Sequence, residues 1–334
     1  MDNSQKAEKK IRMNETRPVE YSLTPPYPRN MMLGLTNTCN HRCIFCCYRN
    51  NPPKAVNMSK EKAFDIIKQG YELGVRELGF CLISEPFMSE HLEDCVGYAK
   101  SLGYEYVYFT TNGSLASKDR MERLWTNGLD SIKFSVNAAT RETYKKVHGR
   151  DDFDRVIQNI IAADELRKKN TLPHDASIFV SFIETIANKN EAELLHTMLG
   201  NVIDNFYTIP AINMNGKLYE EMEQGIVLHK SAVKDYTDVI TSTYIDQVDR
   251  HLCYKIFNRF SVTAEGYYTV CCGDLYNEAV VADLNKVSLK EAWTCDAVKQ
   301  VRSYFLNKNI PSNLFFYNCI YNTNNPVKPI SDWV

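Results

Sequence analysis

The chain has 334 residues, of which 44% are hydrophobic and 24% charged, a composition typical of a globular protein with a sizeable core. Its formal net charge of -2 gives no overall attraction to nucleic acid or to anionic membranes. No apolar run is long enough to span a bilayer, and the polar N-terminus has no signal-peptide core. We therefore expect a cytoplasmic protein with no nucleic-acid or membrane partner.

Residues 1–30 are charged and then proline-rich, which predicts a polar N-terminal arm. A short buried strand is expected at 31–35, and it leads directly into a cysteine-rich loop. Ser59 then caps a predicted helix that ends at Gly74 and has apolar residues four positions apart.

Strands and helices alternate from there as far as residue 213. Six strands alternating with helices predict parallel β-α-β units, and we expect a partial (β/α)6 barrel of the TIM type over 31–213. A doubly wound open sheet would show the same alternation. The later strands are expected at 77–83, 106–110, 131–136, 177–183 and 204–209, and the helices at 90–102, 118–125, 152–168 and 191–199.

The composition changes after residue 213. A linker with a helix is expected over 214–250, followed by a small α+β domain over 251–325. Within that domain a hairpin is predicted at 260–270. Ser288 and Glu291 form a capping box that opens a helix reaching about residue 305.

The eleven cysteines point to metal or redox chemistry, because a disulfide framework needs an oxidising compartment. Three of them, Cys81, Cys95 and Cys295, stand apart, and we expect these to be buried apolar thiols. The others form two groups, which are Cys39, Cys43, Cys46 and Cys47 near the N-terminus and Cys253, Cys271, Cys272 and Cys319 near the C-terminus.

The run CNHRCIFC, which follows the first predicted strand, is the most specific motif of the sequence. Its three cysteines, Cys39, Cys43 and Cys46, have a spacing that can hold three corners of a cubane iron–sulfur cluster. Because the loop supplies three ligands and not four, one iron is left for an outside ligand. An open iron turns an electron-transfer centre into a reaction centre.

Other interpretations of this loop fit less well. A zinc site could use the same cysteines with His41 or Cys47, but zinc sites usually pair two short chelates across a longer gap. A redox-active C-x-x-C pair would leave Cys39 unexplained, and four core cysteines do not fit so polar a segment. We expect His41 and Arg42 to be solvated or to support the cluster ligands.

Polar residues follow the ends of three further predicted strands, at the rim where a barrel has its active-site loops. Each alone is an ordinary turn residue, but together they indicate a site. His148, beside Gly149, is expected on the surface of a loop. The strand-end residues are Ser84, Glu85, Asn112, Ser135 and Asn137.

On these motifs the chain resembles the radical S-adenosylmethionine (SAM) superfamily over about residues 30–320. The stretch GLDSIKFSVNAATRETY at 128–144 is similar to members with a C-terminal SPASM or twitch domain. The resemblance implies a partial barrel and a [4Fe–4S] cluster whose open iron binds SAM. An electron from the cluster would break a sulfur–carbon bond, and the resulting 5′-deoxyadenosyl radical would abstract a hydrogen atom from the substrate.

The resemblance also implies roles for single residues. Phe45 would lie near the adenine, and Glu85 would bind the SAM amino group, as the acidic residue of the family's Gly-Gly-Glu motif does. Ile83 and Ser84 replace the two glycines here, which leaves the neighbouring backbone contacts open. The iron ligands would be Cys39, Cys43 and Cys46, and the further SAM-binding candidates are Ser84, Asn112, Ser135 and Asn137.

The C-terminal cysteines agree in part with the family's auxiliary-cluster pattern. Cys253 and Cys271 have the usual spacing, but only Cys319 follows them. One auxiliary [4Fe–4S] cluster is therefore expected, as in a twitch domain. Its fourth ligand could be Cys272, a carboxylate such as Asp274, water or the substrate. The other interpretation is that no second cluster forms.

What the resemblance implies is an enzyme of the oxidoreductase or isomerase type that uses a reductant such as flavodoxin or ferredoxin. Its substrate would be carbohydrate-like or another small molecule, or alternatively a ribosomal peptide. The N-terminal arm is shorter than a leader-binding domain of about eighty residues, which favours a small molecule. A non-catalytic iron–sulfur or zinc protein is the alternative of another class. No catalytic side chain is singled out.

Overall fold

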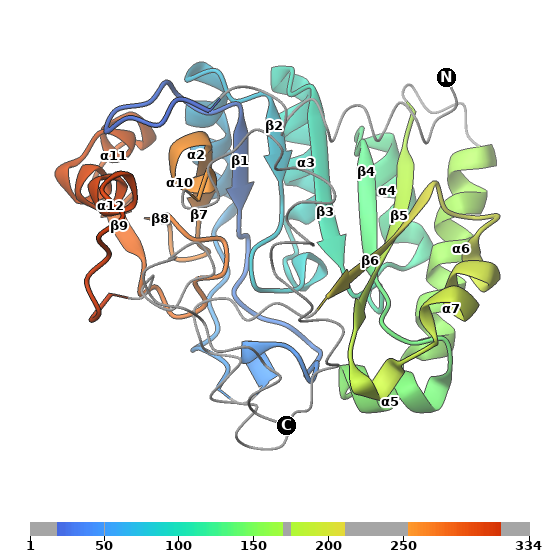
Figure 1. The fold of residues 1–334 in the computed structure, drawn as a ribbon. Helices are drawn as coiled ribbons and strands as arrows, with labels where there is room; N and C mark the ends of the chain where they lie inside the picture. Colours follow the sequence, from blue (N-terminus) through green and yellow to red (C-terminus); the bar gives the residue numbers. More distant parts are fainter. Residues whose placement is uncertain (1–18, 50, 170–174, 211–252, 315–334) are drawn as a thin grey trace.

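The structure is a computed structural model that describes residues 19–49, 51–169, 175–210 and 253–314. In these residues nine strands form one sheet in the order β6-β5-β4-β3-β2-β1-β7-β8-β9 (Figure 1). The predicted linker helix within 214–250 and the predicted ligand Cys319 lie outside the described residues.

The first six strands are parallel neighbours in chain order. A doubly wound sheet would reverse its order at a switch point, whereas consecutive order is that of a barrel. The predicted partial barrel is thus confirmed. Its strands are β1 (Asn30–Leu33), β2 (Glu77–Gly79), β3 (Tyr106–Thr111), β4 (Ser131–Ser135), β5 (Ser177–Glu184) and β6 (Asn205–Pro210).

The helices between these strands begin and end where local chemistry dictates. Ser59 Oγ accepts from the N–H of Lys62 to cap α2, and Ser117 caps α4 in the same way. The helices are α2 (Lys60–Glu72), α3 (Leu92–Leu102), α4 (Lys118–Thr126), α5 (Arg141–His148), α6 (Phe153–Lys169) and α7 (Ala192–Leu199), with 3-10 turns η1 (Cys47–Arg49), η2 (Pro86–Met88) and η3 (Ile186–Asn188).

Two differences from the predicted elements shape the rim of the barrel. The second strand ends at Gly79 and not at residue 83, because the chain turns away so that the N–H of Glu85 reaches the carbonyl of Thr38 at 2.9 Å. Helix α5 was not predicted. It fills the connection between β4 and α6, where only a loop was expected.

Side chains alternate between the two faces of the sheet. On β4, Ile132 and Phe134 are fully buried in the hydrophobic core, while the half-buried Lys133 and Ser135 point to the opposite, inner face of the barrel. The helices cover the apolar face, so the inner face is the one left for polar chemistry.

The C-terminal region extends the same sheet. Strand β7 (Arg259–Val262) pairs in parallel with β1, and β8 (Tyr267–Thr269) and β9 (Val280–Asp283) follow as antiparallel neighbours. The predicted hairpin is confirmed, and β9 is an additional strand. Because β7 lies beside β1, the described cysteines of the second group, Cys253, Cys271 and Cys272, are on the strand-β1 side of the barrel, from which the cysteine-rich loop also begins.

The helix predicted for 288–305 is wrong in one respect, since it is two helices, α11 (Leu289–Trp293) and α12 (Asp296–Leu306), preceded in the domain by α10 (Lys255–Asn258). The extended backbone of Cys295 separates them. Part of the N-terminal arm covers this pair, because the indole N–H of Trp293 donates to the carbonyl of Pro25 at 2.8 Å. Among the described residues, no helix has the length and apolar character to cross a membrane.

Candidate active site

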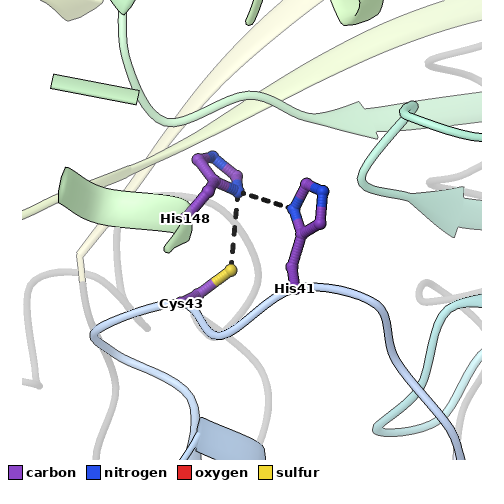
Figure 2. A group of neighbouring side chains, drawn as sticks. All are labelled: His41, Cys43 and His148. Carbon is purple, nitrogen blue, oxygen red and sulfur yellow. Dashed lines mark hydrogen bonds between the residues drawn. The ribbon is translucent and has the colours of Figure 1, made fainter. Parts of the chain in front are cut away.

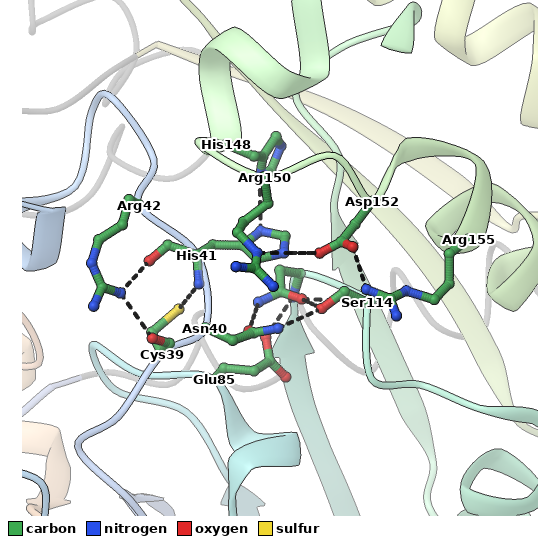
Figure 3. Close-up of polar contacts among 12 residues, drawn as sticks. Cys39, Asn40, His41, Arg42, Glu85, Ser114, His148, Arg150, Asp152 and Arg155 are labelled. Atoms are coloured by element: carbon green, nitrogen blue, oxygen red, sulfur yellow. Dashed lines mark hydrogen bonds and ion pairs between the residues drawn. The ribbon is translucent and has the colours of Figure 1, made fainter.

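The loop Cys39–Cys46, here called the cysteine loop, is held against the end of β3 by side-chain amides, and Figure 3 shows the bond between Asn40 and Ser114. The amide of Asn112 donates to Oδ1 of Asn40 at 2.8 Å, and the amide of Asn40 donates to Oγ of Ser114 at 2.8 Å. Asn112 also receives two bonds from Ser114 on its own Oδ1. The first and third strand ends therefore meet, as the sequence predicted for a barrel rim.

Helix α5 holds the other side of the cysteine loop. The N–H of Arg42 donates to the carbonyl of His148 at 3.0 Å, and the N–H of Ile44 donates to the carbonyl of Val147 at 2.9 Å. The last carbonyls of a helix have no partner within it, so the loop supplies what α5 lacks. Gly149, at φ 67°, allows this contact, because a Cβ there would lie 2.9 Å from the carbonyl oxygen of Arg42.

The side chain of Arg42 also serves the loop. Its Nη1 donates to the carbonyls of Cys39 at 3.0 Å and of His41 at 2.9 Å, and its guanidinium lies over the ring of Tyr48 at 4.8 Å. Arg42 is half-buried and binds loop carbonyls, which agrees with a supporting role and not with a freely solvated one.

The three loop cysteines are half-buried and lie within electrostatic range of one another. Burial raises the pKa of Cys39 to about 12 and that of Cys43 well above its ordinary range, and Glu85 adds to both effects. These shifts favour the protonated thiol in the metal-free loop. Iron would reverse this, because a coordinating thiol loses its proton to the metal.

Glu85 is a buried carboxylate, 2% exposed, in the loop after β2, where it caps the 3-10 turn η2. It accepts from Thr111 Oγ at 2.6 Å, from the N–H of Phe87 at 3.1 Å and from the N–H of Asn112 at 2.7 Å. Burial raises the pKa of Glu85 to about 7, although these three bonds oppose it. None of the three partners is a cation.

Two histidines are buried against Cys43 (Figure 2): His148, which was expected on the surface of a loop, and His41, which was expected to be solvated or to support the cluster ligands. His41 and His148 are each 1% exposed, and Nδ1 of His148 lies 3.3 Å from Nδ1 of His41 and 3.5 Å from Sγ of Cys43. Burial lowers the pKa of His41 to about 4, in spite of Asp152, and lowers that of His148 well below its usual range. The expectation of a surface His148 is wrong, because α5 carries it inward.

These three side chains are also the one group of metal-ligating type, among the residues with described positions, whose ligand atoms all lie within 4.8 Å of one another. The described cysteines, Cys39, Cys43, Cys46 and Cys47 in the first group and Cys253, Cys271 and Cys272 in the second, form no cysteine-only group of this kind. A cubane cluster binds each thiolate to a different iron, so its ligands need not gather around a single point.

Asn137 and Ser135 lie at the end of β4, as predicted. Asn137 is fully buried, and its Oδ1 accepts from the N–H of Ile183 at 2.6 Å while its Nδ2 lies 3.3 Å from Nε2 of His148 and 3.4 Å from Oγ of Ser135. Its amide is thus occupied within the protein. Phe45 and Ser84 are half-buried on the cysteine loop and beside Glu85, respectively.

The second cysteine group lies beside two cations. Nζ of Lys255 is 3.6 Å from Sγ of Cys272. Burial raises the pKa of the Cys272 thiol, but Lys255 and Arg259 outweigh it, so the pKa is lowered on balance. Cys253 is buried just before α10, and Sγ of Cys271 accepts from the N–H of Gly273 at 3.3 Å.

The carboxylate of Asp274, the predicted alternative ligand, is already hydrogen-bonded to residues of the turn around it. Its carboxylate accepts from Thr269 Oγ at 2.8 Å and from the N–H groups of Glu278 at 2.8 Å and Ala279 at 2.9 Å. Of the three isolated cysteines, Cys95 is fully buried as expected. Cys81 and Cys295 are only half-buried; Cys81 lies in the loop after β2, and Cys295 precedes α12 and packs against the core.

Comparison with known proteins agrees with these features. Residues 33–198 match the radical SAM superfamily, and residues 253–315 match an iron–sulfur cluster-binding domain, SPASM; together they span about two thirds of the chain. Similar curated proteins include a probable GTP 3′,8-cyclase of Saccharolobus solfataricus, 37% identical over 134 residues, which are 40% of this chain and 43% of that protein. A probable GTP 3′,8-cyclase of Methanosarcina mazei is 26% identical over 273 residues, 75% of this chain and 80% of that protein.

Solved structures share the fold. SuiB of Streptococcus suis bound to its precursor peptide SuiA has a TM-score of 0.66 and 16% identity, and the alignment covers 95% of this chain and 74% of that one. The same protein bound to SAM has a TM-score of 0.63 and 16% identity, with coverage of 90% and 72%.

Proposed function

The chain belongs to the radical SAM superfamily, and from this premise we propose that Cys39, Cys43 and Cys46 bind three irons of a [4Fe–4S] cluster whose fourth iron takes SAM. When bound, this pair supplies one-electron cleavage of SAM to a 5′-deoxyadenosyl radical that abstracts a hydrogen atom from the substrate. The protein's own contribution is to hold, orient and shield these groups.

The observation that carries the proposal is the state of Glu85. It is a buried carboxylate within electrostatic range of the cluster cysteines, and its three hydrogen-bond partners are neutral. A carboxylate has about four lone-pair positions, so one remains open. Arg120 acts on this carboxylate through its charge alone, since its hydrogen bonds go to Glu93 and to backbone carbonyls. A buried anion without a directly bonded cation is costly, and the ammonium group of SAM is a cation of the right kind to pair with it.

The neighbouring residues fit supporting roles. Asn112 gives Glu85 its backbone N–H and holds the cysteine loop through Asn40, so one residue joins the cluster loop to the SAM amino site. We assign Asn137 to the support of His148 and not to SAM, because its amide is already bonded. Phe45, Ser84 and Ser135 stay predicted contacts of SAM.

The inner face of the barrel suits a substrate with an anionic group. Lys133 of β4 and Arg259 of β7 both act on the thiol of Cys81, where burial raises the pKa and these two cations oppose it. Nη1 of Arg259 contacts the sulfur of Met32 at 3.2 Å, and its Nε has no hydrogen-bond partner among the described residues. A buried unpaired guanidinium nitrogen is unfavourable unless a ligand binds it.

We therefore propose a small-molecule substrate that carries a phosphate or carboxylate, with an outcome of the oxidation or isomerisation type. The curated relatives named as probable GTP 3′,8-cyclases have such a substrate in their names, although the first of them matches over 43% of its length. A peptide is the competing substrate class, and SAM cleavage measured with small anionic compounds and with peptides distinguishes the two.

For the second centre we propose that Cys253 and Cys271, with Cys319, bind an auxiliary [4Fe–4S] cluster. Lys255 and Arg259 would offset part of its negative charge, since both act on Cys272 next to it. Cys272 is the candidate fourth ligand, because its lowered pKa already favours the thiolate.

Reductive cleavage of SAM tests the enzyme assignment. The protein is reconstituted anaerobically with iron and sulfide, and 5′-deoxyadenosine is measured after addition of SAM and a strong reductant. Formation of the product in the wild type, and its loss in a variant with alanine at Cys39, Cys43 and Cys46, is expected. A reconstituted wild type that makes no 5′-deoxyadenosine contradicts the proposal.

A further inference from the structure

The imidazole of His148 faces the thiol of Cys43 on one side (Figure 2) and the amide groups of Asn137 on the other. Its ring stacks on Tyr144 with centroids 4.1 Å apart, and its backbone carbonyl binds the N–H of Arg42. Both its ring and its main chain are therefore fixed against the cysteine loop.

The hydrogen bonds of Asn137 decide which nitrogen of His148 carries the proton. The backbone N–H of Asn137, which can only donate, lies 3.2 Å from Nε2 of His148. The side-chain Nδ2 of Asn137 lies 3.3 Å from the same atom, and its orientation is set because Oδ1 accepts from Ile183. Nε2 is therefore an acceptor, and the proton of the neutral ring is on Nδ1.

Two acceptors compete for that proton. Nε2–H of His41 donates to Oδ2 of Asp152 at 3.3 Å, which leaves Nδ1 of His41 as an acceptor 3.3 Å from Nδ1 of His148. The sulfur of Cys43 is the second acceptor, at 3.5 Å. Asp152 is itself held by Arg155, and Arg150 lies 3.8 Å from it. The carboxylate that ends this series of hydrogen-bonded side chains is therefore fixed in place.

We propose that His148 is a positioning residue that donates an N–H hydrogen bond to the thiolate of Cys43, and that His41, oriented by Asp152, competes for the same proton. The strength of the bond to the thiolate is then set by the protein and not by solvent. The inference rests on the proposed assignment of Cys43 as an iron ligand.

Hydrogen bonds to cluster sulfurs stabilise the more electron-rich, reduced state and raise the reduction potential. The two histidines should consequently have opposite effects. Loss of the donor His148 should make the cluster harder to reduce, whereas loss of the competitor His41 should release the proton fully to Cys43 and make the cluster easier to reduce. A merely structural role would loosen the loop in both cases and would not change the sign.

The test is an EPR-monitored redox titration of the reconstituted full chain, followed on the signal that changes when SAM is added. His148→Phe keeps the ring that stacks on Tyr144 but removes the donor. His148→Gln retains an N–H donor. His41→Phe removes the competing acceptor, and His196→Phe, on α7 with its ring stacked on Phe206 at 5.0 Å, is the matched control away from the loop.

At a fixed potential, we expect His148→Phe to have about a tenfold lower ratio of reduced to oxidised cluster, which is about 59 mV for a one-electron couple. His148→Gln should lie between that variant and the wild type, His41→Phe should shift in the opposite direction, and His196→Phe should not shift. An exchangeable proton coupling to the reduced cluster, seen by comparing H2O and D2O, should weaken in His148→Phe.

Wild-type potentials in both His148 variants and in His41→Phe, with normal iron content, would overturn the inference. A shift of the same sign in His148→Phe and His41→Phe would also overturn it. If His148→Phe binds no cluster, His148→Gln and His41→Phe decide by the same criteria. Failure of the ligand assignment is separate, since alanine at the three loop cysteines would then leave the iron content unchanged.

Discussion

The backbone N–H of Asn112, at the end of β3, donates to Oε2 of Glu85, in the loop after β2, across 2.7 Å. This bond joins the end of β3 to the loop after β2, and Asn112 also holds the cysteine loop through Asn40. The carboxylate that we assign to SAM and the loop that we assign to the cluster are thus placed relative to each other by one residue. A substitution at either residue should therefore affect both the proposed SAM site and the cysteine loop.

We expect Glu85→Gln to weaken SAM binding by about tenfold or more, because a charge-assisted bond to an ammonium contributes roughly 1.5–3 kcal/mol. Equilibrium binding of SAM to the reconstituted protein, measured by calorimetry, gives the affinity. Glu90→Gln is the matched control, since Glu90 is 87% exposed at its side chain and pairs only with the neighbouring His91 in the described structure. Equal affinity in Glu85→Gln and wild type would remove Glu85 from the SAM site.

The stability of the metal-free protein should depend on Glu85 and pH. Because burial raises the pKa of Glu85 from 4.5 to about 7, the folded state binds its proton more tightly than the unfolded state does. The contribution of Glu85 to the free energy of unfolding is therefore largest below about pH 4.5, falls as the pH rises through about 7 and is constant at higher pH. Glu85→Gln should remove this dependence.

Urea unfolding of both metal-free proteins at pH 5 and pH 8 measures the effect. Relative to wild type, Glu85→Gln should gain roughly 2 kcal/mol between the two pH values, because all other groups titrate alike in both proteins. A difference that does not change with pH would mean that the carboxylate has an ordinary pKa.

Alanine at Cys39, Cys43 and Cys46 should lower the iron content by about four atoms per chain, since a cubane cluster has four irons. The iron that remains reports on the auxiliary centre. Cys47→Ala is the control within the same segment, and it should keep both the iron content and SAM cleavage. Loss of iron in Cys47→Ala would indicate that the ligand set includes this residue.

Gly149→Ala should weaken the contact between α5 and the cysteine loop. The residue has φ 67°, and a Cβ would lie 2.9 Å from the carbonyl oxygen of Arg42. Gly74→Ala is a matched control, because Gly74 has φ 96° with nothing within 4 Å of the added carbon. Both variants carry the strain of a left-handed residue, about 1–2 kcal/mol, but only Gly149→Ala should also lower cluster uptake.

Arg259→Met tests the anionic substrate. SAM cleavage is measured in the presence of phosphorylated and carboxylated sugars and nucleotides and of their neutral counterparts. We expect stimulation by an anionic compound and an increase of its KM by about tenfold or more in Arg259→Met. Lys286→Met is the control, because its side chain is 79% exposed and binds Asp283. Stimulation by peptides alone would favour the competing substrate class.

Much of the site could be predicted from the sequence because its signals are local. The spacing of the loop cysteines lies within eight residues, and the alternation that predicts parallel strands lies within each element. Glu85 and Asn112 could be placed at one rim since the carboxyl ends of parallel strands meet there. Ser59 and Gly74, which delimit α2, needed no information beyond their neighbours.

Other features depend on residues that are far apart in the chain. His148 ends a short helix that Thr140 caps, and nothing local in the sequence shows that its ring turns inward. Its contact with His41 spans 107 positions, and that of Glu85 with Asn112 spans 27. The packing of whole helices and strands decides which atoms meet in such contacts.

The chemistry of this protein was therefore determined by its sequence, in the three thiols that can bind iron and the strands that carry them. Only the tertiary structure decided the environment of those thiols, because burial, pKa and hydrogen-bond partners arise from neighbours supplied by distant segments. Helix α5 folds back onto the cysteine loop, β7 pairs with β1, and a histidine expected at the surface comes to lie 3.5 Å from the sulfur of Cys43.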